Sequence, residues 1–324
     1  MEKEKDVNDL INLFKSNLID DDKVCYISTS FFSMNYQYNP LVFQLPRIKN
    51  KYIITRSMIE NLKLKNITSD FQQFFIQVIH KYEDEMEPIL GYSMQIPFES
   101  ELKYFILNNY TKEINIMLKV DAVELPDCIY DTVLRIYPKW SSLNQNQISI
   151  SKLIFFISIF EILYTQRYHD MEQSTSVESY KALFKKANLS YKTLQLPSFF
   201  KNNILVDDNV SIREYFMSQS CFDNARNELL FVNFSSNPFD MLFHFHKVIS
   251  DINLLARENQ KKNYTIAFDD LFVLLYGIFL SSDLSDLFFA SKVIDMYLKK
   301  FHLCSFFEYA KSTIEALVIY LKTP

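Results

Sequence analysis

Two glycines in 324 residues constrain this chain more than any other feature of its sequence. Glycine averages about 7% of protein residues, and it is the residue that adopts positive φ angles at little cost. Tight β-hairpin turns, phosphate-binding loops and Rossmann motifs depend on such positions. The near absence of glycine therefore argues against hairpin-rich β folds and glycine-loop nucleotide sites. It favours helices joined by Asn, Asp and Ser turns.

The composition argues against several classes of protein. A hydrophobic fraction of 48% excludes wholesale disorder. The net charge is −5 and no long basic run occurs, so a nucleic-acid partner is not expected. The four cysteines have no Cys-x-x-Cys spacing, which argues against a zinc ribbon and a redox motif and predicts a reduced protein. They are Cys25, Cys128, Cys221 and Cys304.

The longest apolar runs are not typical of membrane spans. Leu153–Tyr164 is short and contains Glu161, whereas Leu271–Ala290 carries two aspartates. A spanning helix needs about 20 residues with few or no charges. The charged segment Met1–Asp6 is unlike a signal peptide. We therefore expect buried helices, no transmembrane segment and a cytoplasmic location, with peripheral association with early endosomes left open.

Apolar residues recur at helical spacing in six stretches of the first 170 residues. This spacing predicts helices over 6–18, 57–65, 69–87, 99–119, 127–136 and 150–168. The runs Cys25–Thr29 and Tyr52–Thr55 are more typical of extended segments. The polar stretch 141–149 is predicted to be a loop.

The C-terminal half has clearer helix boundaries. Asn237-Pro238 predicts a helix start, with asparagine as cap and proline at the first helical position. Asp269 and Asp270 open the next helix, which is apolar almost all round and is expected to be central. A turn over 283–286 and a helix over 287–297 are expected to follow.

The last helix has one apolar stripe. Its spacing predicts that the stripe is buried and that Tyr309 lies on a surface edge. The stripe comprises Phe307, Ala310, Ile314, Leu317 and Leu321.

These patterns predict an all-α protein in which an N-terminal helical bundle packs on a C-terminal helical domain. The polar, weakly patterned stretch 170–179 is the preferred boundary. We expect a partly helical region of unknown role over 1–98, a helical bundle over 99–170 and a further domain over 171–324.

Several motifs of the C-terminal part, in their order and spacing, resemble the VPS-nine (vacuolar protein sorting nine) domain of Rab exchange factors. The family has an Ala-x-x-Glu-Leu segment and a Pro-x-x-Lys-Leu helix start, similar to Ala225–Leu229 and Pro238–Leu242. Its central helix begins Asp-(Asp/Glu)-(Phe/Leu)-Leu-Pro-Val-Leu, similar to Asp269–Leu275. It closes with Tyr-x-x-Thr-x-Leu, similar to Tyr309–Ile314. The resemblance covers roughly residues 180–322.

The chain departs from the family pattern at a few positions. Val273 replaces a proline, Met241 a lysine and Ser312 a threonine. The glycines that usually precede the tyrosine are absent, and Ser305 and Glu308 lie in that neighbourhood. The loss of these glycines is expected to change the loop that positions Tyr309, and therefore to affect activity more than fold.

The resemblance implies a guanine-nucleotide exchange factor for an endosomal Rab GTPase of the Rab-five class. In this reading Asp269 is the acidic finger that pairs with the phosphate-binding lysine and repels phosphate and Mg²⁺. Tyr309 holds the switch region away from the nucleotide, and Ser312 supports that contact by hydrogen bonding. Asp270, Val273 and Ser312 are expected to contact the GTPase. Apolar helix faces around them would form a groove for the mobile switches.

Each site residue has a simpler structural interpretation. An aspartate before an apolar helix is usually an N-cap or a dipole partner. For Asp270 we keep the interpretation of a cap or a solvent-exposed residue, beside its GTPase contact. A lone tyrosine is usually core packing. His244 and His246 are two apart on a helix, so they point in different directions and do not predict a metal pair. No metal site and no cofactor are expected.

A helical scaffold that binds a small GTPase, or another protein, without promoting exchange is the alternative function. Exchange itself involves no covalent chemistry, and no hydrolase or transferase constellation can be distinguished in the sequence.

Overall fold

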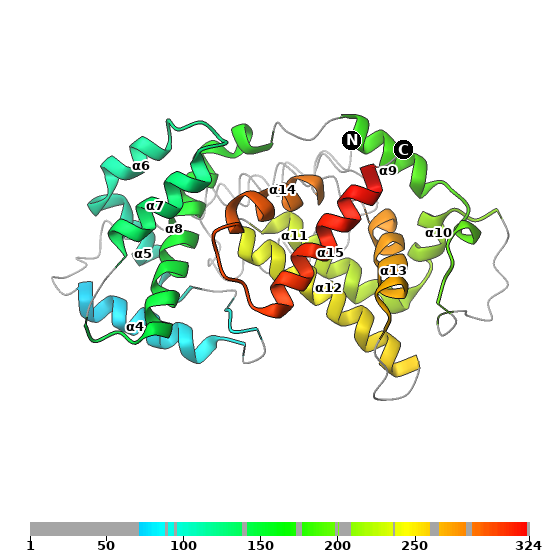
Figure 1. Cartoon of the computed structure of the whole chain (residues 1–324), viewed down its shortest axis with the longest axis horizontal. Coiled ribbons are helices and arrows are strands. Elements are labelled where there is room, and N and C mark those ends of the chain that lie inside the picture. The colour runs from blue at the N-terminus through cyan, green and yellow to red at the C-terminus, as the bar shows by residue number, and fades with distance from the viewer. Residues whose placement is uncertain are drawn as a thin grey trace, which may run out of the picture.

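A computed structural model describes most of the chain after residue 70 (Figure 1). The described residues are 71–87, 90–93, 96–137, 141–172, 177–197, 200, 209–235, 237–259, 266–282 and 287–322. They are predominantly helical and contain no strand, only the isolated bridges Glu87–Tyr92 and Ser190–Ser211. The all-α fold class is therefore confirmed.

The described residues form twelve α-helices and two short 3-10 turns. The first five are α4 (Phe71–Glu85), α5 (Glu99–Asn109), α6 (Thr111–Met117), α7 (Leu125–Ile136) and α8 (Gln145–Glu172). The other seven are α9 (Val177–Ala187), α10 (Ile212–Met217), α11 (Asp223–Phe234), α12 (Pro238–Asn259), α13 (Phe268–Ser281), α14 (Leu287–Leu298) and α15 (Ser305–Lys322). The 3-10 turns are Tyr191–Thr193 and Ser220–Phe222.

Most predicted helices in the described range are found, with shifted ends. The predicted helix 99–119 is two helices, α5 and α6, which meet at Tyr110. The predictions over 6–18, 57–65 and the extended runs 25–29 and 52–55 lie outside the described residues, as do the turn 283–286 and Cys25. The division into domains at 98 and 170 stays a prediction.

The predicted loop over 141–149 is wrong in its second half, because α8 already begins at Gln145. The reason is a reciprocal cap that the apolar pattern does not show. The Gln147 backbone N–H donates to Asn144 Oδ1 at 3.0 Å, and the Asn144 N–H donates to Gln147 Oε1 at 3.1 Å. Two amides at the helix start are thereby satisfied, as in a capping box.

The polar stretch 170–179 is also more helical than its sequence suggested. Helix α8 continues to Glu172 and α9 begins at Val177, so both ends of this stretch are helical.

Within the described residues, Gln145–Tyr164 of α8 is the one segment long and apolar enough to cross a membrane, and 72% of its most apolar window is buried in the protein. The prediction that the chain has no transmembrane segment stays a prediction.

The start of α12 agrees with the sequence. The Asp240 backbone N–H donates to Asn237 Oδ1 at 3.0 Å, and the helix begins at Pro238. Asparagine at the cap and proline at the first position therefore have the predicted roles.

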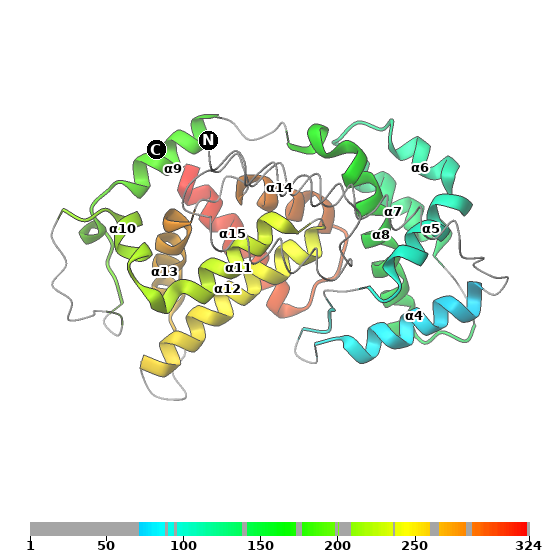
Figure 2. The same cartoon turned by 180° about the vertical axis from the view of Figure 1, so that it is seen from behind.

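The helices are arranged along the long axis of the molecule. Helices α4–α8 lie at one end, α9, α10 and α13 at the other, and α11, α12, α14 and α15 between them (Figures 1 and 2). The buried apolar side chains of the described residues belong to one continuous core that runs from α4 to α15. Phe75 of α4 packs edge-to-face on Phe155 of α8, at 5.2 Å between ring centroids.

Helix α13 is fixed by α10, at a point where only glycine fits. A β-carbon on Gly277 would lie 2.1 Å from the ring of Phe216, which is fully buried. The absent side chain therefore lets the Phe216 ring lie directly on the backbone of α13. One of only two glycines in the chain is used here, in a helix interior where it is otherwise unfavourable.

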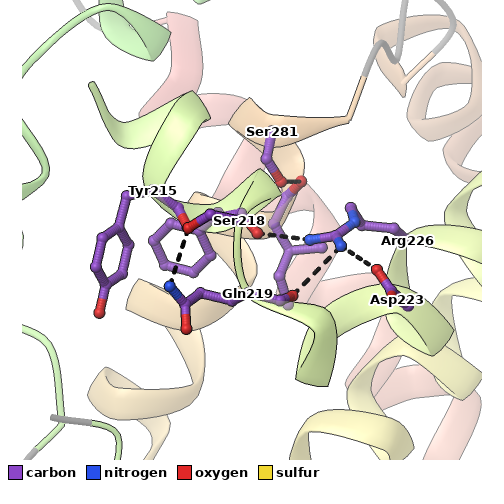
Figure 3. Close-up of polar contacts among 8 residues, drawn as sticks. Tyr215, Ser218, Gln219, Asp223, Arg226 and Ser281 are labelled. Atoms are coloured by element: carbon purple, nitrogen blue, oxygen red, sulfur yellow. Dashed lines mark hydrogen bonds and ion pairs between the residues drawn. The ribbon is translucent and has the colours of Figure 1, made fainter. Parts of the chain in front are cut away.

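Arg226 of α11 holds the end of α10 in place (Figure 3). Its Nη1 donates to the Phe216 carbonyl at 2.6 Å and its Nη2 to the Gln219 carbonyl at 3.3 Å. An ion pair with Asp223 orients the guanidinium. Carbonyls at a helix C-terminus lack intrahelical partners, so this arginine caps α10 and positions Phe216 against α13.

A buried polar network connects α5, α8 and the start of α12. Lys103 Nζ lies 2.6 Å from Glu161 Oε2 and also pairs with Glu99. Asn237 Nδ2 donates to Glu161 Oε1 at 3.0 Å and to Asp240 Oδ2 at 2.7 Å. Tyr92 completes the network, because its hydroxyl donates to Asp240 Oδ1 at 2.6 Å.

We expect Lys103→Met to destabilise the fold by roughly 3–5 kcal/mol, because it leaves the Glu161 carboxylate buried without its cation. The double variant Lys103→Met with Glu161→Met is expected to recover a substantial part of that loss. Chemical denaturation of the single and double variants measures both. If the double variant is as unstable as the sum of the two single variants, the two groups are not a coupled pair.

Candidate functional site

The N-terminus of α13 presents two carboxylates in its first turn. The helix begins at Phe268, and its cap residue Ala267 makes no side-chain capping bond. Asp269 and Asp270 therefore occupy the second and third helical positions rather than the cap. The N-cap interpretation is wrong for both, and the interaction with the positive end of the helix dipole remains.

Asp269 is exposed and Asp270 is half-buried. Within the described part of the chain, neither carboxylate has an ion-pair partner. A negative charge stabilised by the helix end, but not neutralised by a neighbour, is available to a cation on another molecule.

Tyr309 lies on the second turn of α15, beside the start of α13. All five members of the predicted stripe, from Phe307 to Leu321, are buried, whereas Tyr309 is 43% exposed. The predicted surface position of Tyr309 is thus confirmed. Its ring meets that of Phe268 edge-on, with 6.5 Å between centroids. Partial burial raises the pKa of Tyr309, so the phenol is neutral at physiological pH and can donate a hydrogen bond.

A row of aromatic rings continues from this contact along α13 and α15. Phe268 contacts Phe272, with 5.8 Å between ring centroids. Tyr320 of α15 packs on Phe272 at 5.6 Å and on Tyr276 at 5.2 Å. Burial raises the pKa of Tyr276 to about 12. We call this set the aromatic strip: Phe268, Phe272, Tyr276, Tyr309 and Tyr320.

The other predicted contact residues have different environments. Val273 is half-buried one turn after Asp269, and Ser312 is exposed one turn after Tyr309. Beside Ser312, Thr313 Oγ1 donates to the Tyr309 carbonyl at 2.7 Å, a bond within α15, and the role expected of Ser312 at the GTPase contact stays a prediction. Met241, which replaces the family lysine, is fully buried, so it has a packing role.

The structure therefore brings Asp269 and Tyr309 to one surface through Phe268, and adds aromatic residues that the sequence analysis did not select. Phe268, Phe272 and Tyr276 recur every four residues, which places them on one face of α13. That spacing was visible in the sequence, but buried core positions have the same spacing. Only the partial exposure of Phe268, at 47%, distinguishes a surface strip from core.

No metal site is found among the described residues, which contain no cluster of three potential metal-ligating side chains. His244 Nδ1 lies 2.8 Å from Glu228 Oε2, whereas His246 Nε2 lies 3.2 Å from Ser250 Oγ. The two histidines thus have different neighbours, as their spacing predicted. Cys128, Cys221 and Cys304 are free thiols.

Comparison with models of known protein families finds no match to this sequence. Comparison with curated proteins finds no significant match either.

The exposure of Tyr309 yields a test of its role. We expect Tyr309→Ala to lower the free energy of unfolding by about 1 kcal/mol, the size of one lost aromatic contact. Leu317→Ala, at a position 1% exposed on the same helix, is expected to lower it by roughly 2–5 kcal/mol because it leaves a cavity. Urea denaturation of both variants measures the difference. Equal losses would show that Tyr309 is a core residue.

Proposed function

We propose that this chain is a guanine-nucleotide exchange factor for a Rab GTPase of the Rab-five class. The observation that carries the proposal is the exposed Asp269 carboxylate at the N-terminus of α13, next to the aromatic strip and the exposed Tyr309. The resemblance of the motifs around both residues to the VPS-nine domain supplies the partner class.

The carboxylate would act on the charges that hold the nucleotide. A Rab protein binds its phosphates through a P-loop lysine and a Mg²⁺ ion. Asp269 competes for that lysine and repels the phosphate oxygens and the metal shell. The carboxylate lies in the first turn of α13, where it interacts favourably with the positive end of the helix dipole, and the helix backbone sets its position.

The exposed rings of the aromatic strip, those of Phe268, Tyr309 and Tyr320, would hold the mobile switch segments of the GTPase, whereas the buried Tyr276 packs on Tyr320 and supports them. Partly exposed aromatic rings bury a large apolar area and lose little conformational entropy on binding. Tyr309 adds a neutral hydroxyl that can donate a hydrogen bond to the displaced switch. Asp270, Val273 and Ser312 flank the strip on α13 and α15 and would complete the contact.

The scaffold alternative uses the same surface. A helical protein could bind a GTPase through the aromatic strip while Asp269 has no effect on the nucleotide. The two functions differ in the state of the partner that is bound, and this difference is measurable.

We expect Asp269→Asn to lower the rate of Rab-five-class nucleotide release about a hundredfold, on the order of what one preorganised electrostatic group supplies. Stability should fall by only about 0.3–1 kcal/mol, the usual helix-dipole contribution. Release of a fluorescent nucleotide and thermal unfolding measure the two effects. Glu308→Gln, an exposed carboxylate on the first turn of α15, is the matched control and should leave release unchanged. Full exchange by Asp269→Asn would refute the acidic-finger role.

We further expect the protein to bind nucleotide-free Rab more tightly than the GDP-loaded or GTP-loaded forms. Only a difference in affinity between states can shift nucleotide occupancy. Titration calorimetry with EDTA-stripped and loaded GTPase gives the three affinities. A preference for the GTP-loaded form would favour the scaffold.

A further inference from the structure

The end of the molecule opposite α4–α8 carries exposed apolar residues together with lysines. Phe184 of α9 is 67% exposed and Ile319 of α15 is 68% exposed. Leu189, in the turn after α9, is 44% exposed. Lys185, Lys192 and Lys322 are exposed on the same segments. We call these six residues the basic edge.

The charge of these segments differs from that of the whole chain. Residues 182–197 and 316–322 contain four lysines and no acidic residue, whereas the whole chain has a net charge of −5. On the adjoining α10, the Glu214 carboxylate accepts hydrogen bonds from the Ser211 backbone N–H and hydroxyl, at 3.0 and 2.8 Å. Glu315 of α15 lies 3.6 Å from Lys311. Nearby acids on α10 and α15 are thus engaged with their own elements.

The fourth lysine joins the two segments. Lys186 Nζ donates to the Tyr320 carbonyl at 2.8 Å and lies 5.2 Å from the centre of the Tyr320 ring. This bond caps the last turn of α15 and ties it to α9. The basic edge is therefore built on two helices that are fixed to each other.

Both views place α9 and the C-terminal end of α15 along the same edge of the molecule (Figures 1 and 2). Tyr309, near the beginning of α15, and the start of α13 lie away from that edge. A partner of the basic edge would consequently leave Asp269 accessible.

We propose that the basic edge docks on a membrane surface rich in anionic phospholipids. Exposed lysines next to exposed aromatic and aliphatic side chains match the two components of such a surface. The lysines are attracted to the anionic headgroups, and Phe184, Leu189 and Ile319 reach the boundary with the acyl chains. An anionic lipid surface complements the local positive charge, which repels another lysine-rich surface of the same chain.

The attraction has a measurable size. One lysine near an anionic membrane changes the partition coefficient about fivefold, and the effect falls within a Debye length. Two lysines should therefore change it about 25-fold, and added salt should weaken the binding.

Co-sedimentation of the full chain with phosphatidylcholine vesicles, with and without phosphatidylserine, tests the proposal. We expect binding only with phosphatidylserine, and an about 25-fold weaker partition for Lys185→Gln with Lys192→Gln. Lys112→Gln with Lys119→Gln, exposed lysines of α6 and the following turn, is the matched control and should bind as the parent protein does. Thermal unfolding should be unchanged in both variants.

The apolar contribution is tested separately. The double variant Phe184→Ser with Ile319→Ser should lose the vesicle binding that persists at high salt. The matched control is Ile116→Ser with Val123→Ser, at positions 59% and 81% exposed, and it should keep that binding. Equal binding to neutral and anionic vesicles would overturn the proposal, and so would unchanged binding of the Lys185 and Lys192 variant. A third outcome would also overturn the proposal. If the parent protein does not bind vesicles but self-associates, and Phe184→Ser with Ile319→Ser abolishes the self-association, the occupant of the basic edge is a second copy of the chain.

Discussion

The buried ion pair of Lys103 and Glu161 is the constraint on which the arrangement of the helices depends. Both residues are almost fully buried, at 7% and 8% exposure, where an unpaired charge would be strongly destabilising. Burial favours the neutral amine, but the carboxylates of Glu161 and Glu99 outweigh it and raise the pKa of Lys103. Lys103 therefore keeps its positive charge, and α5 and α8 must bring these two side chains together.

The same network reaches the candidate site. Burial and the neighbouring Asp240 carboxylate raise the pKa of Tyr92, so its phenol remains a donor to Asp240 at the start of α12. The Tyr92 ring also packs edge-on against Phe307, with 5.6 Å between centroids. Phe307 is two residues before Tyr309, so the position of Tyr309 depends on a contact with the segment that precedes α5. An apolar core alone tolerates several packings, and polar groups that must find specific partners restrict it.

The sequence predicted the parts of this structure that depend on local periodicity. Helices α12–α15, the Asn237 cap and the surface position of Tyr309 follow from spacing and capping chemistry within a few residues. The errors arose where polar side chains replaced the apolar signal, as in the reciprocal cap of Asn144 and Gln147. Long-range pairs such as Lys103 with Glu161, or Phe216 with Gly277, depend on the tertiary fold, so a periodic pattern cannot indicate them. For the same reason the pattern could not separate the exposed Phe268 from a core residue.

Helix α15 connects the two proposed surfaces. Its second turn carries Tyr309 of the aromatic strip, and its last turn carries Lys322 of the basic edge. The two residues are 13 positions apart (322 − 309), which in a straight helix corresponds to about 20 Å. Because Lys186 caps the final turn and Phe307 anchors the first, this helix is held at both ends. Under the two proposals, docking of the basic edge would fix Tyr309 and the neighbouring Asp269 no more than about 20 Å above the lipid surface. A GTPase that is itself attached to the same membrane would then meet the carboxylate within a restricted volume, which raises its effective concentration without any further contact.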